Sequence, residues 1–590
     1  MCDAGNACFA ERKKIISRQI EKGPRGGGIL KNYRDGGEAI VEAFRNLGVD
    51  YILSSPGSEW SPVWEAMARQ KVENAPGPTF IDCWHETLAV DMAMGYTAIT
   101  GRPQAVLIHA GVGLMHGSMA VLSATQAEIP LIVMSGESTT FGDDPDQVME
   151  PQWYGGVSVG GAHRLIEPLV KWAGQVTHAS NIYQSVVRAG EMAQRLPQGP
   201  VYLNMSLEAM MQPWSKPDNL RAIPPAPQTV AVEDDIAAVA KLVREAKRPV
   251  IVTESAGRDP AAFAALIALA EKIGAPVIGG RASTYTNFPQ SHPLWLGIQT
   301  FEHLDESDLI LLVDGKAPWY PARKRPGKGA IVSIGAYPIK EHLAYQNLHA
   351  DLYLEGNSAS TLEALVEACS LEALLSPRRE YWAKARIAYQ EGLVAQREAS
   401  LKAEKLDAVA LAAIAADMLP EDTIYIDETI THMPVMRPHL PLNKEQSFFR
   451  VTGGALGQGI GAALGAKLAK RDKPVVLFVG DGSFLYNPII QALGASKAYD
   501  LPIMIVVCNN KRYEAMRKGH VLYYPEGAAE TSKTHYGVNI DAPDVENFGV
   551  HFGFFGAKAS NQEELRKAFA EGLAALKDGR SAILNVSLVR

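Results

Sequence analysis

Short apolar runs alternate with longer stretches of helical periodicity along most of the chain. Strands of a parallel sheet are buried on both faces, so they read as near-continuous apolar runs. The pattern is therefore typical of α/β units in which helices cover both faces of a parallel sheet. The strands expected on this basis span residues 79–83, 105–109, 130–134, 249–253, 275–278, 309–313, 330–334, 423–426, 474–479 and 502–508.

Breaks in this pattern divide the chain into three such units. A linker at residues 216–228 carries four prolines, which interrupt regular structure, and a charged helical connector covers about 376–405. We expect an N-terminal domain at 31–215, a central domain at 229–372 and a C-terminal domain at 406–590. Residues 1–30 are interpreted as a poorly packed extension, to which we assign no function. The predicted fold class is α/β, with three doubly wound parallel-sheet domains.

Composition narrows the range of partners. The chain has 590 residues and a net charge of −8, with both signs mixed along it. No nucleic-acid partner is expected, because such a surface needs clustered Lys and Arg. The N-terminus lacks the apolar core of a signal peptide, and no membrane partner is expected. The five cysteines are scattered without a zinc or disulfide pattern, which favours a cytoplasmic protein.

The sharpest chemical signal lies in the third unit. Gly480-Asp481-Gly482-Ser483 ends one apolar run, and Asn509-Asn510 ends the next. The 26 residues between Gly482 and Asn509 (483–508) are enough for one crossover helix. Both motifs should therefore lie at the carboxyl edge of one parallel sheet, where ligands collect.

The residue types at this edge fit a divalent cation. Such an ion prefers oxygen ligands at about 2.0–2.1 Å, typically a carboxylate, neutral oxygens and phosphate. Asp481 offers charge, Asn510 a neutral oxygen, and a carbonyl near Arg512 a further one. Gly480 and Gly482 let the backbone approach a diphosphate closely. Each motif alone is typical of an ordinary turn; together, at this separation, they indicate a metal site.

The paired motifs resemble those of the thiamine-diphosphate enzyme family, in which GDG is followed some 25–30 residues later by NN. The resemblance extends from about residue 35 to the end of the chain. It implies thiamine diphosphate bound through Mg2+, with Asp481, Asn510 and Arg512 at the metal and Gly482 and Ser483 at the diphosphate. It also implies an active site shared between subunits, so a homodimer or a homotetramer is expected.

A second part of the resemblance lies in the first unit. Trp84-His85-Glu86 follows the expected strand 79–83 and opens an Ala/Met-rich helix. The family's activating glutamate stands in this position, where its carboxyl group shifts the cofactor's pyrimidine to the imino tautomer. Such an acid works best partly buried. The resemblance assigns this role to Glu86, although an acidic residue at a helix N-terminus is also stabilised by the helix dipole.

Two further segments match the family's cofactor site. The glycine-rich stretch 452–461 resembles the segment that bends the cofactor, which implies Leu456 as the apolar wedge and the Gly454 carbonyl as an acceptor for the aminopyrimidine. The same stretch is compatible with a glycine-rich helix packed closely on a sheet. The run Asp427-Glu-Thr-Ile-Thr-His432 resembles a diphosphate loop and implies Thr431 near the diphosphate.

Among the subfamilies, benzoylformate decarboxylase shows the most local matches. Ser55-Pro56-Gly57-Ser58 and His109-Ala-Gly-Val-Gly113 resemble its substrate-binding loop and its catalytic-histidine segment. Ser58 is thereby expected to place the substrate carboxylate, and His109, which titrates near neutrality, to move a proton. A turn serine and a strand-end core histidine are the alternatives. Two departures are Arg323, at the place of a second catalytic histidine, and Lys518-Gly519, at the place of an aromatic pair.

These observations predict a thiamine-diphosphate-dependent lyase that acts on a 2-oxo acid or a 2-hydroxy ketone. The first alternative is a carboligase like acetolactate synthase, or a 2-hydroxyacyl-CoA lyase, with a nucleotide near the basic residues 323–328. FAD is not expected, because Gly315-Lys316 stands where acetolactate-synthase-like enzymes carry an Arg. The second alternative is a catalytically silent relative that serves as a binding subunit.

Overall fold

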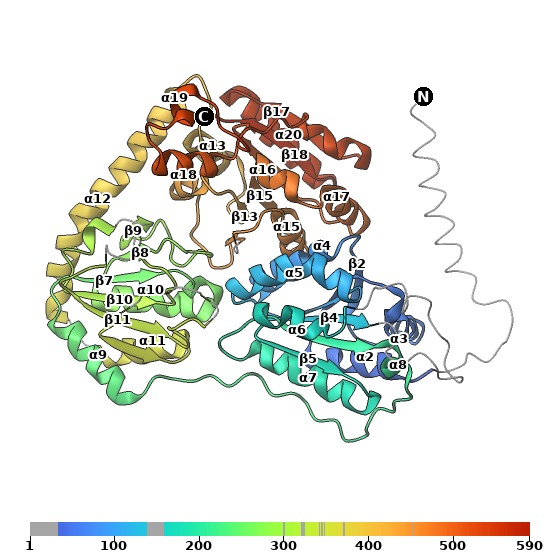
Figure 1. Cartoon of the computed structure of the whole chain (residues 1–590). Coiled ribbons are helices and arrows are strands. Elements are labelled where there is room, and N and C mark those ends of the chain that lie inside the picture. Colours follow the sequence, from blue (N-terminus) through green and yellow to red (C-terminus); the bar gives the residue numbers. More distant parts are fainter. Residues whose placement is uncertain are drawn as a thin grey trace.

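Three six-stranded parallel sheets, each flanked by helices, make up the chain (Figure 1). This confirms the α/β fold class. The computed structural model describes residues 33–137, 159–298, 301–319, 325–341, 343, 346, 349–369, 372–451 and 454–589. The three sheets form a triangle around the centre of the molecule, and the long helix α12 runs along the side that joins the second sheet to the third (Figure 1).

The first sheet has the strand order β2-β1-β3-β4-β6-β5. The crossover direction reverses between β1 and β3, so their carboxyl ends border a crevice suited to a ligand. The strands are β1 (Tyr51–Ser55), β2 (Thr79–Asp82), β3 (Gln104–Ile108), β4 (Leu131–Glu137), β5 (Trp172–Val176) and β6 (Val201–Ser206). The helices are α2 (Gly36–Leu47), η1 (Ser58–Trp60), α3 (Ser61–Val72), α4 (Glu86–Thr100), α5 (Gly111–Gln126), α6 (Ala162–Ile166), η3 (Glu167–Leu169), α7 (Ala179–Gln194) and α8 (Leu207–Met211).

The second sheet has the order β12-β11-β10-β7-β8-β9. Its strands are β7 (Pro249–Thr253), β8 (Val277–Gly279), β9 (Trp295–Ile298), β10 (Leu309–Val313), β11 (Ala330–Gly335) and β12 (Leu352–Glu355). Its helices are α9 (Glu233–Glu245), η4 (Ala256–Arg258), α10 (Pro260–Ile273), η5 (Phe301–His303) and α11 (Ser358–Ala368), and α12 (Glu372–Lys402) forms the connector. The sheet has apolar cores of its own, separate from the core that joins the other two.

The third sheet, ordered β14-β13-β15-β16-β18-β17, repeats the topology of the first. Its strands are β13 (Ile424–Glu428), β14 (Phe448–Arg450), β15 (Val475–Gly480), β16 (Met504–Asn509), β17 (Phe555–Ala559) and β18 (Ala582–Ser587). Its helices are α13 (Ala408–Met418), α14 (Met433–Met436), η7 (Arg437–His439), α15 (Gly459–Ala469), α16 (Asp481–Tyr486), α17 (Ile489–Ala498), α18 (Glu514–Tyr523), α19 (Ala528–Ser532), η8 (Val545–Phe552) and α20 (Gln562–Lys577).

The expected strands lie where the apolar runs placed them, with ends that shift by up to three residues. The ranges 249–253 and 309–313 coincide with β7 and β10, and the range 275–278 became the shorter β8. The ends differ because the ladder partner, rather than the apolar run, determines where strand hydrogen bonding stops.

Helices α4 and α15 pack closely and join the first sheet to the third. Glycines make this approach possible: a Cβ on Gly95 would lie 2.0 Å from the Ala462 carbonyl oxygen, and one on Gly465 would lie 2.0 Å from the Met92 carbonyl oxygen. One apolar core continues across this contact, from the strands of the first sheet to those of the third. The first and third sheets are therefore joined by a closely packed junction.

A buried ionic cluster joins the first sheet to the second. Glu128, at the end of α5, lies 2.7 Å from Lys340 and 2.9 Å from Arg258, and Lys316 lies 3.9 Å away. Three cations around one buried carboxylate hold the pKa of Glu128 far below its usual range, despite the opposing effect of burial.

Among the described residues, no helix is long and apolar enough to cross a membrane.

Asp91 lies at the α4–α15 junction and is fully buried. Within the described residues, neither of its carboxylate oxygens has a hydrogen-bond partner. Burial raises the pKa of Asp91 well above its usual value, and the nearby Glu428 raises it further. The junction therefore favours the neutral form of this side chain.

Replacing Asp91 by Asn should stabilise the protein more at pH 8 than at pH 5. In the unfolded chain Asp91 ionises near pH 3.9, whereas in the folded protein its pKa is raised. The free energy of unfolding of the wild type therefore falls as the pH rises from about 3.9 toward the folded pKa. The total loss is about 1.4 kcal/mol for each unit by which the two pKa values differ. Melting temperatures of Asp91→Asn and wild type at the two pH values measure this. Asp578→Asn, at an exposed carboxylate, is the matched control. A gain that is equal at both pH values would contradict the expectation.

Candidate active site

The carboxyl ends of β1 and β3 bring Ser58 and His109 together with a carboxylate that the sequence analysis missed. The His109 backbone N–H donates to the Ser55 carbonyl at 3.0 Å, which ties the two loops to each other. The buried carboxylate of Glu59 accepts from His109 Nδ1 at 2.9 Å and from the Ala110 backbone N–H at 2.8 Å. The Nδ1 proton is thereby fixed, and the opposite ring nitrogen, Nε2, is the one that can serve as acid or base.

Glycine makes this pairing possible. A Cβ on Gly57 would lie 1.8 Å from His109 Nδ1 and 2.2 Å from Glu59 Oε2, so any larger residue would separate the two side chains. The signal available in the sequence was Glu59 itself, an acidic residue directly after Ser58. Its partner stands 50 positions further along the chain, a relation that local pattern does not reveal.

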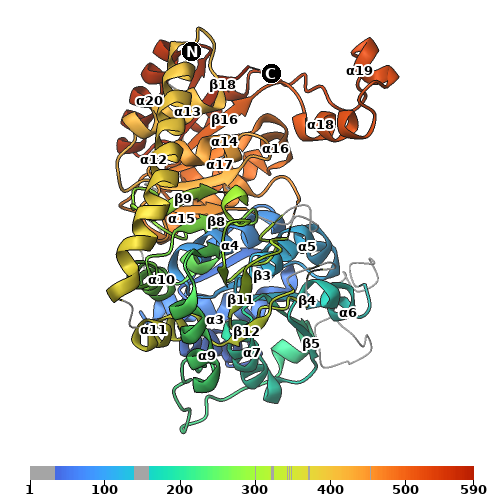
Figure 2. The same ribbon diagram turned by 90° about the vertical axis from the view of Figure 1, so that its left-hand side faces the viewer.

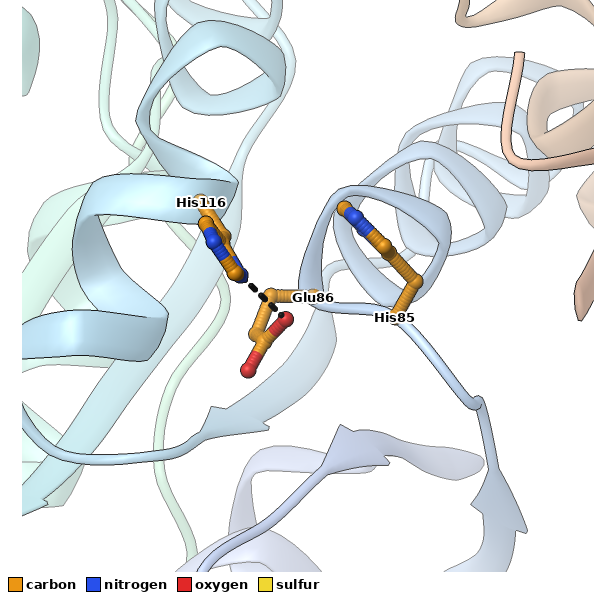
Figure 3. Close-up of side chains that lie close together, drawn as sticks. All are labelled: His85, Glu86 and His116. Atoms are coloured by element: carbon orange, nitrogen blue, oxygen red, sulfur yellow. Dashed lines mark hydrogen bonds and ion pairs between the residues drawn. The ribbon is translucent and has the colours of Figure 1, made fainter.

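Glu86 is the first residue of α4, as the sequence predicts. His85 caps this helix, because its Nδ1 accepts from the Thr87 backbone N–H at 3.2 Å. The Glu86 side chain is 13% exposed, and its Oε2 lies 3.2 Å from His116 Nδ1 on α5 (Figure 3). Oε1 lies on the side of Gly113, where an added Cβ would be 3.0 Å from Oε1 and 2.9 Å from the His109 Cβ. Glu86 and His109 thus flank the bare backbone of Gly113.

The third sheet places Asp481 and Asn510 at the ends of the adjacent strands β15 and β16. Both side chains are buried. Asp481 Oδ1 accepts from the Gly482 N–H at 2.8 Å, and Asn510 Oδ1 accepts from the Arg512 N–H at 3.1 Å. Lys511 has φ +58°, and this left-handed turn brings the backbone of Arg512 back toward Asn510. A Cβ on Gly482 would lie 2.1 Å from the Tyr513 ring, so this glycine lets the two loops meet.

Asp481 carries the clearest sign of a missing ligand. Its Oδ2 is buried and has no hydrogen-bond partner among the described residues. Burial raises the pKa of Asp481, while backbone N–H groups of Gly482 and of residues 510–512 lower it. A bare carboxylate oxygen next to an amide oxygen is the donor set that a divalent cation takes, so the residues fit the expected metal. Ser483 is buried beside them, and its carbonyl accepts from the Asn487 side-chain amide at 2.8 Å.

The glycine-rich loop before α15 is held by a second carboxylate that the sequence did not single out. Glu428, at the end of β13, accepts from the backbone N–H groups of Gln458 at 3.0 Å and Gly459 at 2.9 Å, and also from that of Gly457. The Asn487 side chain completes its shell at 3.0 Å. An anion at this helix N-terminus satisfies the open N–H groups and opposes the helix dipole.

Gly454 and Leu456 lie in this same loop, which is described from Gly454 onward. Gly454 has φ +69°, and Leu456 lines a cavity of about 270 Å3 with His85, Thr87 and Met119 of the first domain. The cavity lies at the junction of the first and third sheets, and neither Glu86 nor Asp481 is among its lining residues. Residues 320–324, with Arg323, lie outside the described residues.

Thr431 lies half-buried on the loop after β13. The beginning of that loop is fixed by Thr429, whose backbone N–H and hydroxyl donate to Asp427 Oδ1 at 2.7 and 2.8 Å. Burial lowers the pKa of the neighbouring His432, and the charge of Lys518 lowers it further. Lys518 belongs to α18, which together with α19 projects from the body of the third domain (Figure 2).

In this α/β fold, two sheets of the same strand order present candidate acid–base groups at one carboxyl edge and candidate cation ligands at the other. Three models of one family match the chain: the N-terminal TPP binding domain at residues 34–152, the central domain at 236–365 and the C-terminal TPP binding domain at 430–586. The chain belongs to the thiamine pyrophosphate enzyme family, which confirms the resemblance seen in the sequence.

Individual relatives are distant but cover nearly the whole chain. The chain is 25% identical to benzoylformate decarboxylase of Pseudomonas aeruginosa over 549 residues, 91% of this chain and 96% of the relative. It is 23% identical to the large subunit of acetolactate synthase isozyme 3 of Escherichia coli, over 94% of both chains. A 4-hydroxybenzoylformate decarboxylase of Rhodococcus jostii has the same fold, with a TM-score of 0.78 at 23% identity over 94% of this chain and 99% of its own.

Replacing Glu428 by Gln should lower the melting temperature. The amide group would face backbone N–H donors, and leaving such buried donors unsatisfied costs about 1–3 kcal/mol. Thermal unfolding of Glu428→Gln against wild type measures this, with Glu421→Gln, at an exposed surface pair in the same domain, as the control. If both variants melted like the wild type, Glu428 would not hold the loop.

Proposed function

We propose that this chain is a thiamine-diphosphate-dependent C–C lyase that acts on a 2-oxo acid, with decarboxylation of the benzoylformate type as its reaction. The proposal rests on two groups of residues, one at the carboxyl edge of each of two sheets. Asp481 and Asn510 offer oxygen ligands at the edge of the third sheet. Glu86, His109 and Ser58 lie at the corresponding edge of the first sheet. The benzoylformate decarboxylase of Pseudomonas aeruginosa, matched over 96% of its length, supports this choice of reaction.

In this proposal Mg2+ is held by Asp481 Oδ2, the Asn510 side-chain oxygen and a carbonyl near Arg512. The backbone of Gly482 and the side chains of Ser483 and Thr431 face the diphosphate. Thiamine diphosphate, when bound, supplies the electron sink for C–C cleavage. The Gly454 carbonyl would accept a hydrogen bond from the cofactor's aminopyrimidine, and Leu456 would pack against its rings.

The residues of the first domain then handle protons and position the substrate. Glu86 holds a proton against the pyrimidine through Oε1, the oxygen on the side of Gly113. The Ser58 hydroxyl donates to the substrate carboxylate, since a neutral donor places the carboxylate without retaining it. His109, held at Nδ1 by Glu59, would carry at Nε2 the proton that the product takes up after the loss of CO2.

A second copy of the chain completes the site in this proposal. The cavity between the first and third domains of one chain is lined by neither Glu86 nor Asp481. The segment after Asn510 exposes large aromatic residues, with Tyr523 76% and Tyr536 90% exposed. Exposed apolar surface of this kind is typical of interaction sites. The protein is therefore proposed to be a cytoplasmic homodimer or homotetramer, with Glu86 of one chain opposite Asp481 of another.

A carboligase or 2-hydroxyacyl-CoA lyase is the alternative, and one cavity favours it. This cavity, of about 320 Å3, lies at the carboxyl edge of the second sheet, between the first and second domains. Ser255, Arg258, Lys340 and Asn357 are among its lining residues and could bind a nucleotide. Saturable binding of coenzyme A to the purified protein would select this alternative over simple decarboxylation.

Replacing Glu86 by Gln should lower turnover by about 10²- to 10⁴-fold, the usual contribution of a general acid, while thiamine diphosphate still binds. The assay incubates the enzyme with a panel of 2-oxo acids and follows CO2, aldehyde and ligated product together, with cofactor binding measured by calorimetry. Glu65→Gln, at an exposed carboxylate of the same domain, is the control. Ligated product without free aldehyde would favour the carboligase, and unchanged turnover would contradict the role of Glu86.

Replacing Asp481 by Asn should act in opposite directions on stability and on binding. The change removes a buried carboxylate oxygen that has no protein partner, so the cofactor-free protein should melt at the same or a higher temperature. Affinity for thiamine diphosphate in the presence of Mg2+ should fall at least about tenfold. Even residues that only hydrogen-bond to a metal ligand typically lower metal affinity or activity by about 10- to 100-fold when they are replaced. Melting curves and titration calorimetry test both; unchanged affinity would contradict the metal assignment.

A further inference from the structure

His116 is a polar side chain that contacts the Glu86 carboxylate. Its Nδ1 lies 3.2 Å from Glu86 Oε2, and the two side chains come from different helices, α5 and α4 (Figure 3). The backbone of His116 is also fixed, because its carbonyl accepts from the Thr87 hydroxyl at 2.7 Å. The contact is therefore positioned by two hydrogen bonds between α4 and α5.

We propose that His116 is a proton relay that connects Glu86 to solvent. The inference rests on the proposed role of Glu86 and assigns a second residue to it. When Glu86 gives its proton to the bound pyrimidine through Oε1, the Nδ1–H of His116 reprotonates the carboxylate at Oε2, and Nε2 takes up a proton from water. The reverse transfers restore the starting state, so one proton is passed on in each direction and no bond to carbon changes.

The difference in exposure between Glu86 and His116 supports these roles, in which His116 exchanges protons with water and Glu86 with the cofactor. In the single chain the Glu86 side chain is 13% exposed and the His116 side chain is 66% exposed, so the imidazole is the more accessible of the two groups. The two Glu86 oxygens also have different neighbours. Oε1 lies beside Gly113 and His109, whereas Oε2 contacts His116. A histidine exchanges protons near neutral pH, which suits a relay.

The other titratable groups around His116 do not replace it. His85 stacks on the His116 ring, with ring centroids 5.4 Å apart, but its Nδ1 is occupied as the cap of α4, and burial lowers its pKa. Elements α6 and η3 also pack on α5. Their groups His163, Arg164 and Glu167 make no hydrogen bond or ion pair with His116 in the described structure.

A metal ion is the competing use of the same side chains. One ligand atom from each of His85, Glu86 and His116 lies within 4.8 Å of the others. An ion bound there would occupy Glu86 and block proton transfer. The relay and the metal site therefore predict opposite effects of removing His116: a metal-occupied enzyme would become faster, and a relay-dependent enzyme would become slower.

The test uses the holoenzyme loaded with thiamine diphosphate and Mg2+. The rate of hydrogen–deuterium exchange at the cofactor's C2 position, measured by quenched-flow NMR without substrate, reports on Glu86 directly. His116→Asn keeps a hydrogen-bond donor but cannot carry a proton, and should slow the exchange about tenfold, less than a full general acid because water replaces part of the relay. His178→Asn, at a capping histidine of α7 in the same domain, should leave it unchanged.

Rescue separates a relay from a structural role. Added imidazole should restore exchange in His116→Ala in proportion to its concentration, and substituted imidazoles should rank by basicity. Exchange slowed in Glu86→Gln but normal in His116→Asn would overturn the relay and leave the role of Glu86 intact. Normal exchange in Glu86→Gln would overturn the proposed function itself. Faster exchange in His116→Asn, with zinc released from the purified protein, would overturn the relay in favour of the metal site.

Discussion

The close packing of α4 on α15 is the constraint on which the rest of the structure depends. Each helix starts at one half of the site: α4 with Glu86, and α15 directly after the loop of Gly454 and Leu456. The helices approach so closely that backbone oxygens lie where side chains of Gly95 and Gly465 would otherwise be. Because a tightly packed interior does not deform gradually, this contact fixes the angle between the first and third sheets.

Buried carboxylates show how the fold distinguishes structure from function. Glu59, Glu128 and Glu428 are each surrounded by donors or cations, which makes them parts of the scaffold. Asp91 has no hydrogen-bond partner among the described residues, and its burial between two helices raises its pKa and favours the neutral acid. Asp481 has an unsatisfied oxygen at the carboxyl edge of a sheet, next to an amide oxygen and a glycine turn. Position at the sheet edge, rather than burial alone, therefore distinguishes Asp481, the residue that we propose as a metal ligand, from Asp91.

The repeated topology explains why one chain carries two complementary half-sites. The first and third sheets share one strand order, so each has a switch point with a crevice at its carboxyl edge. One edge carries Glu86, His109 and Ser58, for which we propose proton transfer and substrate placement, and the other carries Asp481 and Asn510, which we propose as cation ligands. The second sheet has a different order, and none of these residues comes from it. Its ionic contacts with Glu128 hold the end of α5, the helix that begins beside His109 and carries His116.

The sequence by itself determined the fold class and the family, because apolar runs and strand-end motifs are local features. Asp481 and Asn510 could be found since each directly follows a strand, and Glu86 since it opens the helix that comes shortly after β2. Only the tertiary structure paired Glu59 with His109, His116 with Glu86, and Glu428 with the start of α15. These partners stand about 30 to 50 positions apart in the chain. Whether such side chains meet depends on helix rotation, strand register and the space left by glycines, none of which is encoded in the residues next to them.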